Sequence, residues 1–99
     1  MTQFQQLCYQ TLKNQVPAGK VITYARLAKL IGNPKAYRAV GNAMNKNPFA
    51  PEIPCHRVVK TNGDLGGFAY DISLKIKRLQ AEGVSVKNGK IVNFQNICL

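Results

Sequence analysis

The sequence predicts an α+β domain that is mostly helical and resembles a winged helix. Two observations carry this prediction. Two helical segments are joined by a short turn that contains glycine, which is the pattern of a helix-turn-helix. Near the C-terminus, two short apolar runs flank Asn88-Gly89, which is typical of a small β-hairpin with a type I′ turn. With 99 residues the chain has room for one core, so we expect a single domain over residues 1–99.

The helices of the first half follow from apolar spacing and from turn residues. Apolar side chains recur at helical intervals over residues 4–15, which predicts the first helix. Thr23 is a candidate N-cap for a second helix over residues 24–31. A Gly-Asn-Pro turn ends that helix, because glycine suits a C-cap and proline suits a restart. A third helix is therefore expected over residues 35–45.

The second half mixes irregular and regular segments. Three prolines between residues 46 and 55 exclude regular structure there, since each removes a backbone donor and restricts its neighbours. Residues 57–60 read as a short strand, and residues 72–81 as a fourth helix. The hairpin is expected to pair residues 84–87 with residues 90–94.

The charge of the chain favours a polyanionic partner. Fourteen Lys and Arg stand against four Asp and Glu, a formal net charge of +10. Such an excess points to nucleic acid first and to an anionic membrane surface second. No apolar run reaches the ~18 residues of a membrane span, and the polar N-terminus does not read as a secretory signal.

The cysteines indicate a reducing compartment and no metal site. There are three, at positions 8, 55 and 98, and an odd number without a secretory signal favours the cytosol. One histidine and no Cys-x-x-Cys pair leave too few ligands for zinc.

Cys55 and His56 are the sharpest candidates for chemistry. The thiolate is the nucleophilic form of cysteine, and a neighbouring imidazole or cation lowers the pKa of the thiol. Cys55 follows the proline-rich loop, where the backbone can hold a side chain rigidly. The alternative is that Cys55 is a small buried hydrophobe, as we expect for Cys8 on the apolar face of the first helix. Cys98 is expected to be incidental.

Two further features stand out. Arg38 is the only long charged side chain in the middle of the third helix, among small residues that would let another surface approach closely. Either DNA or a packed helix fits that face, and the net charge favours DNA. Glu82 follows a basic helix, at an end where the dipole disfavours a carboxylate. A specific partner such as His56 would explain it, and a solvated surface residue is the alternative.

Several segments together resemble one family. Ile53–Val59 reads Ile-Pro-Cys-His-Arg-Val-Val, Arg38–Gly41 reads Arg-Ala-Val-Gly, and Asn47-Pro48 follows. With the flanking segments Val21–Tyr24 and Leu79–Gly83, these motifs resemble the O6-alkylguanine-DNA alkyltransferases, also called methylated-DNA–protein-cysteine methyltransferases. The resemblance covers roughly residues 3–84, in order and with the family's spacing.

The resemblance implies direct reversal of DNA damage. Similar proteins bind duplex DNA through the minor groove with the helix-turn-helix, flip the alkylated guanine out and move its alkyl group irreversibly to their own cysteine. Each molecule acts once, and no metal or cofactor is needed. We expect a monomer that acts in the cytoplasm, or in the nucleoid or nucleus, wherever the DNA lies.

The family's roles carry over by matching position. Cys55 would be the nucleophile and acceptor, His56 the base acting through a water, and Glu82 the group that orients His56. Asn47 would brace the turn that holds Cys55, Arg38 would replace the flipped base, and Tyr24 would crowd the backbone and donate a proton to the departing guanine. Further DNA contacts would come from Ala36, Tyr37, Gly41 and Ala43, and further pocket residues would be Pro54, Val58 and Phe68.

The chain also departs from the family pattern. The N-terminal domain of many members is expected to be absent, Phe68 stands where tyrosine is usual, and Tyr37 is larger than the residues typical beside the arginine. The main alternative is an alkyltransferase-like protein, which binds alkylated DNA without repairing it and usually carries tryptophan in place of the cysteine. This chain has Cys55 and no tryptophan. A basic winged-helix transcription factor would leave Cys55, His56, Asn47 and Glu82 unexplained.

Overall fold

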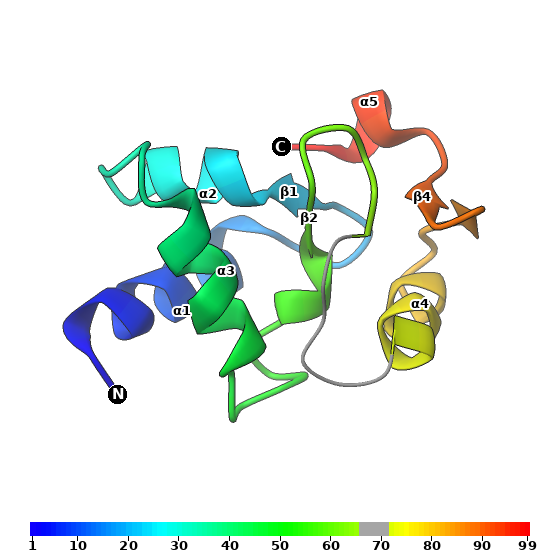
Figure 1. Cartoon of the computed structure of the whole chain (residues 1–99). Coiled ribbons are helices and arrows are strands. Elements are labelled where there is room, and N and C mark those ends of the chain that lie inside the picture. The colour runs from blue at the N-terminus through cyan, green and yellow to red at the C-terminus, as the bar shows by residue number, and fades with distance from the viewer. Residues whose placement is uncertain (66–71) are drawn as a thin grey trace.

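The computed structural model describes residues 1–65 and 72–99 and has an α+β fold (Figure 1). The elements, in chain order, are α1 (Gln3–Gln15), β1 (Ile22–Thr23), α2 (Tyr24–Leu30), α3 (Tyr37–Asn45), the 3-10 helix η1 (Cys55–Arg57), β2 (Val58–Val59), α4 (Ile72–Ala81), β3 (Val86–Lys87), β4 (Lys90–Ile91) and α5 (Phe94–Ile97).

The three helices predicted for the first half are present, with ends that differ from the prediction by one or two residues. The Thr23 side chain caps α2 by accepting a hydrogen bond from the backbone N–H of Arg26 at 3.0 Å. The third helix begins at Tyr37 instead of Lys35. The N–H of Ala36 donates to the Asn33 carbonyl at 2.9 Å. Residues 33–36 therefore form a turn, and α3 begins only after it. The helix-turn-helix arrangement is therefore as predicted.

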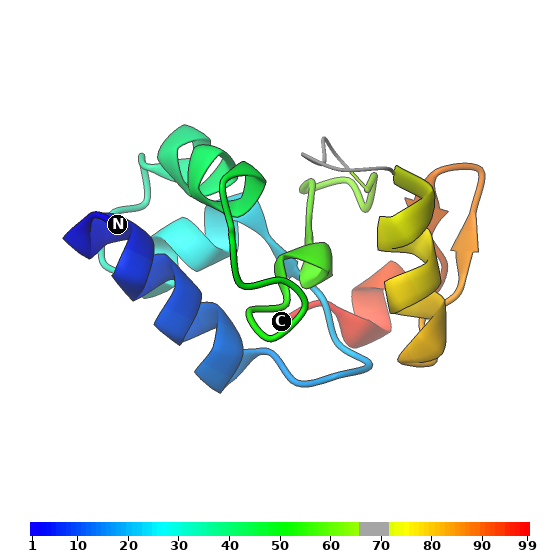
Figure 2. The same ribbon diagram turned by 90° about the horizontal axis from the view of Figure 1, so that it is seen from below.

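A first core lies between α1, α2 and α3 (Figure 2). Cys8 is completely buried in it, as predicted. The hydroxyl of Tyr9, which is also buried there, donates to the Ala43 carbonyl at 2.6 Å. That hydrogen bond fixes the last turn of α3 against α1, and with it the position of the exposed face of α3.

A short parallel pair connects the two halves of the molecule. Ile22 of β1 is in register with Val58 of β2, and Thr23 with Val59. The strand expected to begin at Arg57 begins one residue later, because Arg57 belongs to η1. Since β1 leads directly into α2 and β2 follows η1 directly, this pairing places the start of α2 close to Cys55 and His56.

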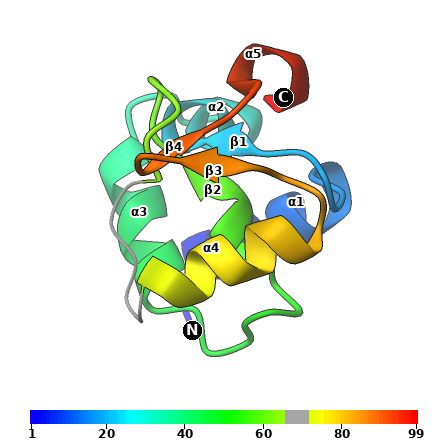
Figure 3. The same ribbon diagram turned by 90° about the vertical axis from the view of Figure 1, so that its right-hand side faces the viewer.

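The second half is built on α4, the hairpin and α5 (Figure 3). The hairpin turn has positive φ at both central residues, 53° at Asn88 and 74° at Gly89, which fits the predicted type I′ turn. The expectation that the second strand reaches Phe94 is wrong. Asn93 adopts a left-handed conformation and starts α5, and the Phe94 ring packs on Gly63, where a Cβ would lie 3.2 Å from it.

The described ranges contain no helix that is both long enough and apolar enough to cross a bilayer. Phe68, expected to line the pocket, lies outside the described residues.

Candidate active site

Cys55 is the first residue of η1 and is 2% exposed. The loop before it is braced by Asn47, a completely buried amide. The Asn47 Nδ2 donates to the Ile53 carbonyl at 2.8 Å, and its Oδ1 accepts from the Phe49 N–H at 2.9 Å. The amide therefore replaces hydrogen bonds that the proline-rich loop cannot make for itself, and it fixes the approach of the chain to Cys55.

His56 and Glu82 lie in contact. The Nε2 atom of His56, a side chain that is 2% exposed, is 3.0 Å from Oε2 of Glu82. Glu82 follows the end of α4, and a turn closed by its N–H to the Leu79 carbonyl at 3.0 Å directs it toward η1. The partner that the sequence suggested for this acidic residue is the one it has.

Arg57 holds the same carboxylate from the other side. Its Nε donates to Oε1 of Glu82 at 2.9 Å and its Nη2 to Oε2 at 2.5 Å. Its Nη1 donates to the carbonyl of Val16, just after α1, at 2.7 Å. This bidentate contact fixes both oxygens of Glu82, so the orientation presented to His56 is determined. Sequence reasoning assigned Arg57 no role in the site.

The electrostatics keep Glu82 ionised and His56 neutral. Burial by itself would raise the pKa of Glu82, but hydrogen bonds from Arg57 and His56 bring it below its ordinary value. Burial lowers the pKa of His56, and the hydrogen bond and charge of Glu82 offset only part of that effect. His56 is therefore neutral near pH 7, which is the state of a base ready to accept a proton.

The tautomer of His56 follows from its partner. An ionised carboxylate can only accept hydrogen bonds, so the ring hydrogen belongs on Nε2, facing Glu82. Nδ1 then carries the lone pair. In the described part of the chain both ring nitrogens are buried and neither makes a hydrogen bond of regular geometry; Nε2 faces the Glu82 carboxylate at 3.0 Å, whereas Nδ1 has no such contact. It is the nitrogen available to take a proton from the neighbouring thiol.

Lys75 is a buried cation that sequence reasoning missed. It is completely buried, and its Nζ donates to the carbonyls of Val58 at 2.8 Å and Leu65 at 2.6 Å. Burial lowers its pKa to about 8, and charge on Cys55 acts against that effect. Lys75 thus lies close to Cys55. A lysine among apolar residues of a basic helix gave no sequence signal to distinguish it from the exposed ones.

Tyr24 borders Cys55 from the start of α2. Burial, together with charge on Cys55, raises the pKa of the Tyr24 phenol to about 12. The phenol therefore stays protonated when the thiol is ionised, so it can act as a hydrogen-bond donor toward a group that reacts at Cys55.

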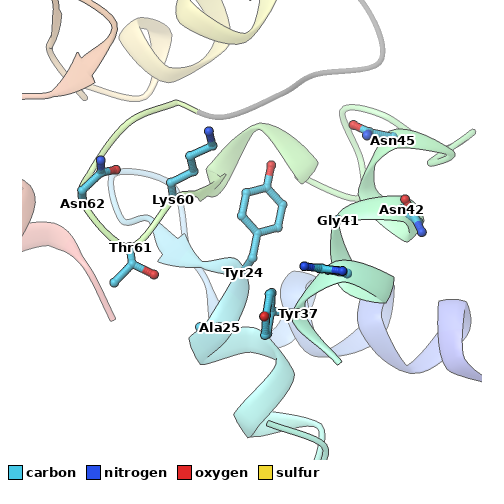
Figure 4. Close-up of a pocket in the computed structure, with 10 residues that line it drawn as sticks. Tyr24, Ala25, Tyr37, Gly41, Asn42, Asn45, Lys60, Thr61 and Asn62 are labelled. Atoms are coloured by element: carbon cyan, nitrogen blue, oxygen red, sulfur yellow. The ribbon is translucent and has the colours of Figure 1, made fainter. Parts of the chain in front are cut away.

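An open hollow of about 950 Å³ lies beside these residues (Figure 4). Its walls are the outer face of α3 and the turn after β2, with Tyr24 between them. The lining residues are Tyr24, Ala25, Tyr37, Arg38, Gly41, Asn42, Asn45, Lys60, Thr61 and Asn62. A Cβ on Gly41 would lie 3.9 Å from the Tyr24 ring, at ordinary van der Waals contact.

Some predicted site residues are placed elsewhere. Ala43 cannot contact DNA through its side chain, because that side chain is 2% exposed and packs in the first core. Pro54 and Val58 are buried next to Cys55 and are not among the described residues that line the hollow. Ala36 is half-buried at the start of α3 and does not line the hollow either. Helical spacing identified the small residues of α3 but did not say which of them face inward.

Comparisons with known proteins point to one family. Residues 3–84 match the family model described as 6-O-methylguanine DNA methyltransferase, DNA binding domain. Over 82 residues the chain is 49% identical to a methylated-DNA–protein-cysteine methyltransferase of Methanosarcina acetivorans, covering 83% of this chain and 52% of that protein. The chain spans about half the length of the curated relatives it matches.

Two solved structures are similar in different ways. The DNA complex of the Mycobacterium tuberculosis protein OGT has a TM-score of 0.80 at 40% identity, covering 84% of this chain and 50% of that one. The S. pombe protein Atl1, in complex with damaged DNA containing O6-carboxymethylguanine, has a TM-score of 0.88 at 28% identity, covering 100% of this chain and 96% of that one. The family-model match covers most of the chain and includes Cys55, His56 and Glu82, so this chain belongs to the family of 6-O-methylguanine DNA methyltransferase DNA-binding domains.

Proposed function

We propose that this chain repairs alkylated guanine in duplex DNA by moving the O6-alkyl group to Cys55. The observation that carries the proposal is the relay formed by Cys55, the neutral His56 that follows it, and an ionised Glu82 in contact with His56. Tyr24 connects this relay to the open hollow, whose lining also includes Arg38 and Lys60. A relay of this kind activates a thiol, and a binding surface alone has no need of it.

The proposed reaction begins with extrusion of the base. The exocyclic oxygen of a stacked and paired guanine cannot reach a thiol, so the nucleotide must turn out of the helix at a cost of a few kcal/mol. Arg38 lies exposed on α3 in the wall of the hollow, from where it would fill the place of the missing base. A mispaired alkylguanine costs less to extrude, which supplies part of the selectivity.

Transfer then follows as a displacement at carbon. His56 takes the thiol proton, through a water, at Nδ1, and Glu82 stabilises the imidazolium that forms. The thiolate sulfur attacks the alkyl carbon, a C–S bond forms and the C–O6 bond breaks. The electron pair leaves with guanine, toward which Tyr24 donates a proton. The product on Cys55 is a thioether, so each chain acts once.

A protein that binds alkylguanine without repairing it is the second candidate. It is favoured by the likeness to Atl1 along almost the full length of both chains. Cys55 and its relay favour repair, because binding requires no nucleophile. The test measures the O6-methylguanine that remains in the DNA. A duplex with O6-methylguanine is incubated with excess protein and digested to nucleosides. Repair converts O6-methylguanine to guanine in proportion to the protein added, whereas a binding protein leaves it unchanged.

Arg38→Ala is expected to slow repair of duplex DNA by about 10- to 100-fold and to leave transfer from free O6-benzylguanine within about twofold. Only a stacked substrate requires extrusion, at a cost of a few kcal/mol, and Arg38 is assigned to that step. The two transfer rates are measured under single-turnover conditions. An equal loss with both substrates would assign Arg38 to the fold instead.

Binding to undamaged duplex is expected to weaken steeply with salt and to vary little with sequence. A net charge of +10 implies contacts with phosphates, and each neutralised phosphate adds roughly 0.9 to the slope of log affinity against log salt. Fluorescence anisotropy at several salt concentrations gives the slope. An affinity that stays constant between low and physiological salt would contradict this.

A further inference from the structure

Tyr37 presents an aromatic ring to the hollow that the proposed reaction does not use. It is the first residue of α3 and is 48% exposed. Figure 4 shows its ring below that of Tyr24, and both side chains line the hollow. Among the residues that the structure describes, its ring stacks on no other aromatic ring.

The surroundings of the ring fit a nucleic acid. Arg38 follows it on α3 and Lys60 stands on the opposite wall of the same hollow. A groove that combines cations with an exposed aromatic face is the arrangement that proteins use to follow a sugar–phosphate backbone while a base stacks on the ring. The formal charge of +10 favours that occupant over an apolar protein surface.

We propose that Tyr37 is a stacking platform for a nucleobase at the site of extrusion. This inference rests on the proposed function, in which Arg38 takes the place of the flipped base. Extrusion exposes base faces that were stacked, and Tyr37 is the residue adjacent to Arg38. Its ring covers one of those faces, which stabilises the opened duplex without touching the reacting atoms.

The test measures affinity in a Cys55→Ala background, so that the lesion duplex is bound and not consumed. Three substitutions separate stacking from simple apolar contact. Tyr37→Ala removes the ring, Tyr37→Leu keeps apolar volume without an aromatic face, and Tyr37→Phe keeps the face without the hydroxyl. Phe49→Ala is the matched control, because Phe49 is 45% exposed and does not line the hollow.

Tyr37→Ala and Tyr37→Leu are expected to weaken binding to an O6-methylguanine duplex by between about 5- and 150-fold, the value of one base–aromatic stack. Tyr37→Phe and Phe49→Ala are expected to bind within about twofold of the background protein. Equal affinity for Tyr37→Ala, or full affinity for Tyr37→Leu, would overturn the proposal.

A second measurement separates this inference from the function on which it rests. In chains that retain Cys55, conversion of O6-methylguanine to guanine in the lesion duplex is measured for the wild-type sequence and for Tyr37→Ala. A chain that binds the lesion duplex through Tyr37 and transfers nothing would refute repair and leave the stacking role supported. If the wild-type chain transfers the alkyl group and Tyr37→Ala binds the lesion duplex as tightly as the background protein, the stacking role is refuted and repair is supported.

Discussion

Cys55→Ala is expected to abolish alkyl transfer completely and to leave binding to an O6-methylguanine duplex intact. The nucleophile is lost, and neither other cysteine can replace it. Cys8 is buried in the first core, where burial raises the pKa of its thiol to about 11. The pKa of Cys98 is also raised, mainly by burial, and Cys98 pairs with Val21 beside the C-terminus. Alkyl transfer is measured as loss of O6-methylguanine from the duplex, and binding by anisotropy.

Cys98→Ser is the matched control for that substitution. It removes a free thiol outside the relay, and repair at the wild-type rate is expected. If Cys55→Ala still removed methyl groups from DNA, the assignment of the acceptor would be wrong. If Cys98→Ser were the inactive variant, the acceptor would have to be placed at Cys98, beside Val21 and the C-terminus.

Glu82→Gln is expected to slow transfer at pH 7 by at least about tenfold, a part of the ~10²–10⁴ that general base catalysis contributes. Glutamine can still accept a hydrogen bond from Arg57, so the fold and the affinity for DNA should survive. The charge that stabilises the imidazolium is lost. Without Glu82 the pKa of His56 falls further below its ordinary value, so His56 becomes a weaker base for the thiol.

The pH dependence separates this role from a structural one. In the wild-type protein the lowered pKa of His56 keeps the base neutral at pH 7, and the transfer rate declines only as pH falls through that pKa. In Glu82→Gln the pKa of His56 falls further, so the acid-side decline of the rate is expected to move to lower pH, and the rate above that decline is expected to be reduced because His56 is a weaker base. Single-turnover rates across the pH range give both profiles. Glu52→Gln makes the same charge change on an exposed residue and should match the wild type, whereas superimposable profiles for Glu82→Gln would remove Glu82 from the site.

Local patterns predicted most of the helices and the turn of the hairpin. Thr23 and Asn88-Gly89 act through their immediate neighbours, so their roles could be derived from a few residues of sequence. The C-terminal end could not be derived in this way. Phe94 alternates as a strand residue would, but its ring packs on Gly63, a contact that depends on the tertiary fold.

The site could be predicted where the reactive side chains are adjacent in the sequence. Cys55 and His56 are neighbours, and the odd position of Glu82 pointed to a partner. Arg57 and Lys75 were missed for a different reason. Each acts through contacts with residues distant in the chain, Glu82 and Val16 for Arg57, and the Val58 and Leu65 carbonyls for Lys75. Among fourteen basic residues nothing in the sequence distinguishes Lys75, and the motif that contains Arg57 does not show that Arg57 contacts Glu82.

The measurement that tests the central claim most directly is the mass of the protein after reaction. The chain is incubated with a duplex containing O6-methylguanine, and the masses of the intact protein and of its proteolytic peptides are measured by mass spectrometry. Transfer to Cys55 predicts an increase equal to one methyl group per chain, located on the peptide that contains Pro54, Cys55 and His56. Protein of unchanged mass that holds the lesion duplex tightly would contradict the repair reaction and identify the chain as a lesion-binding protein.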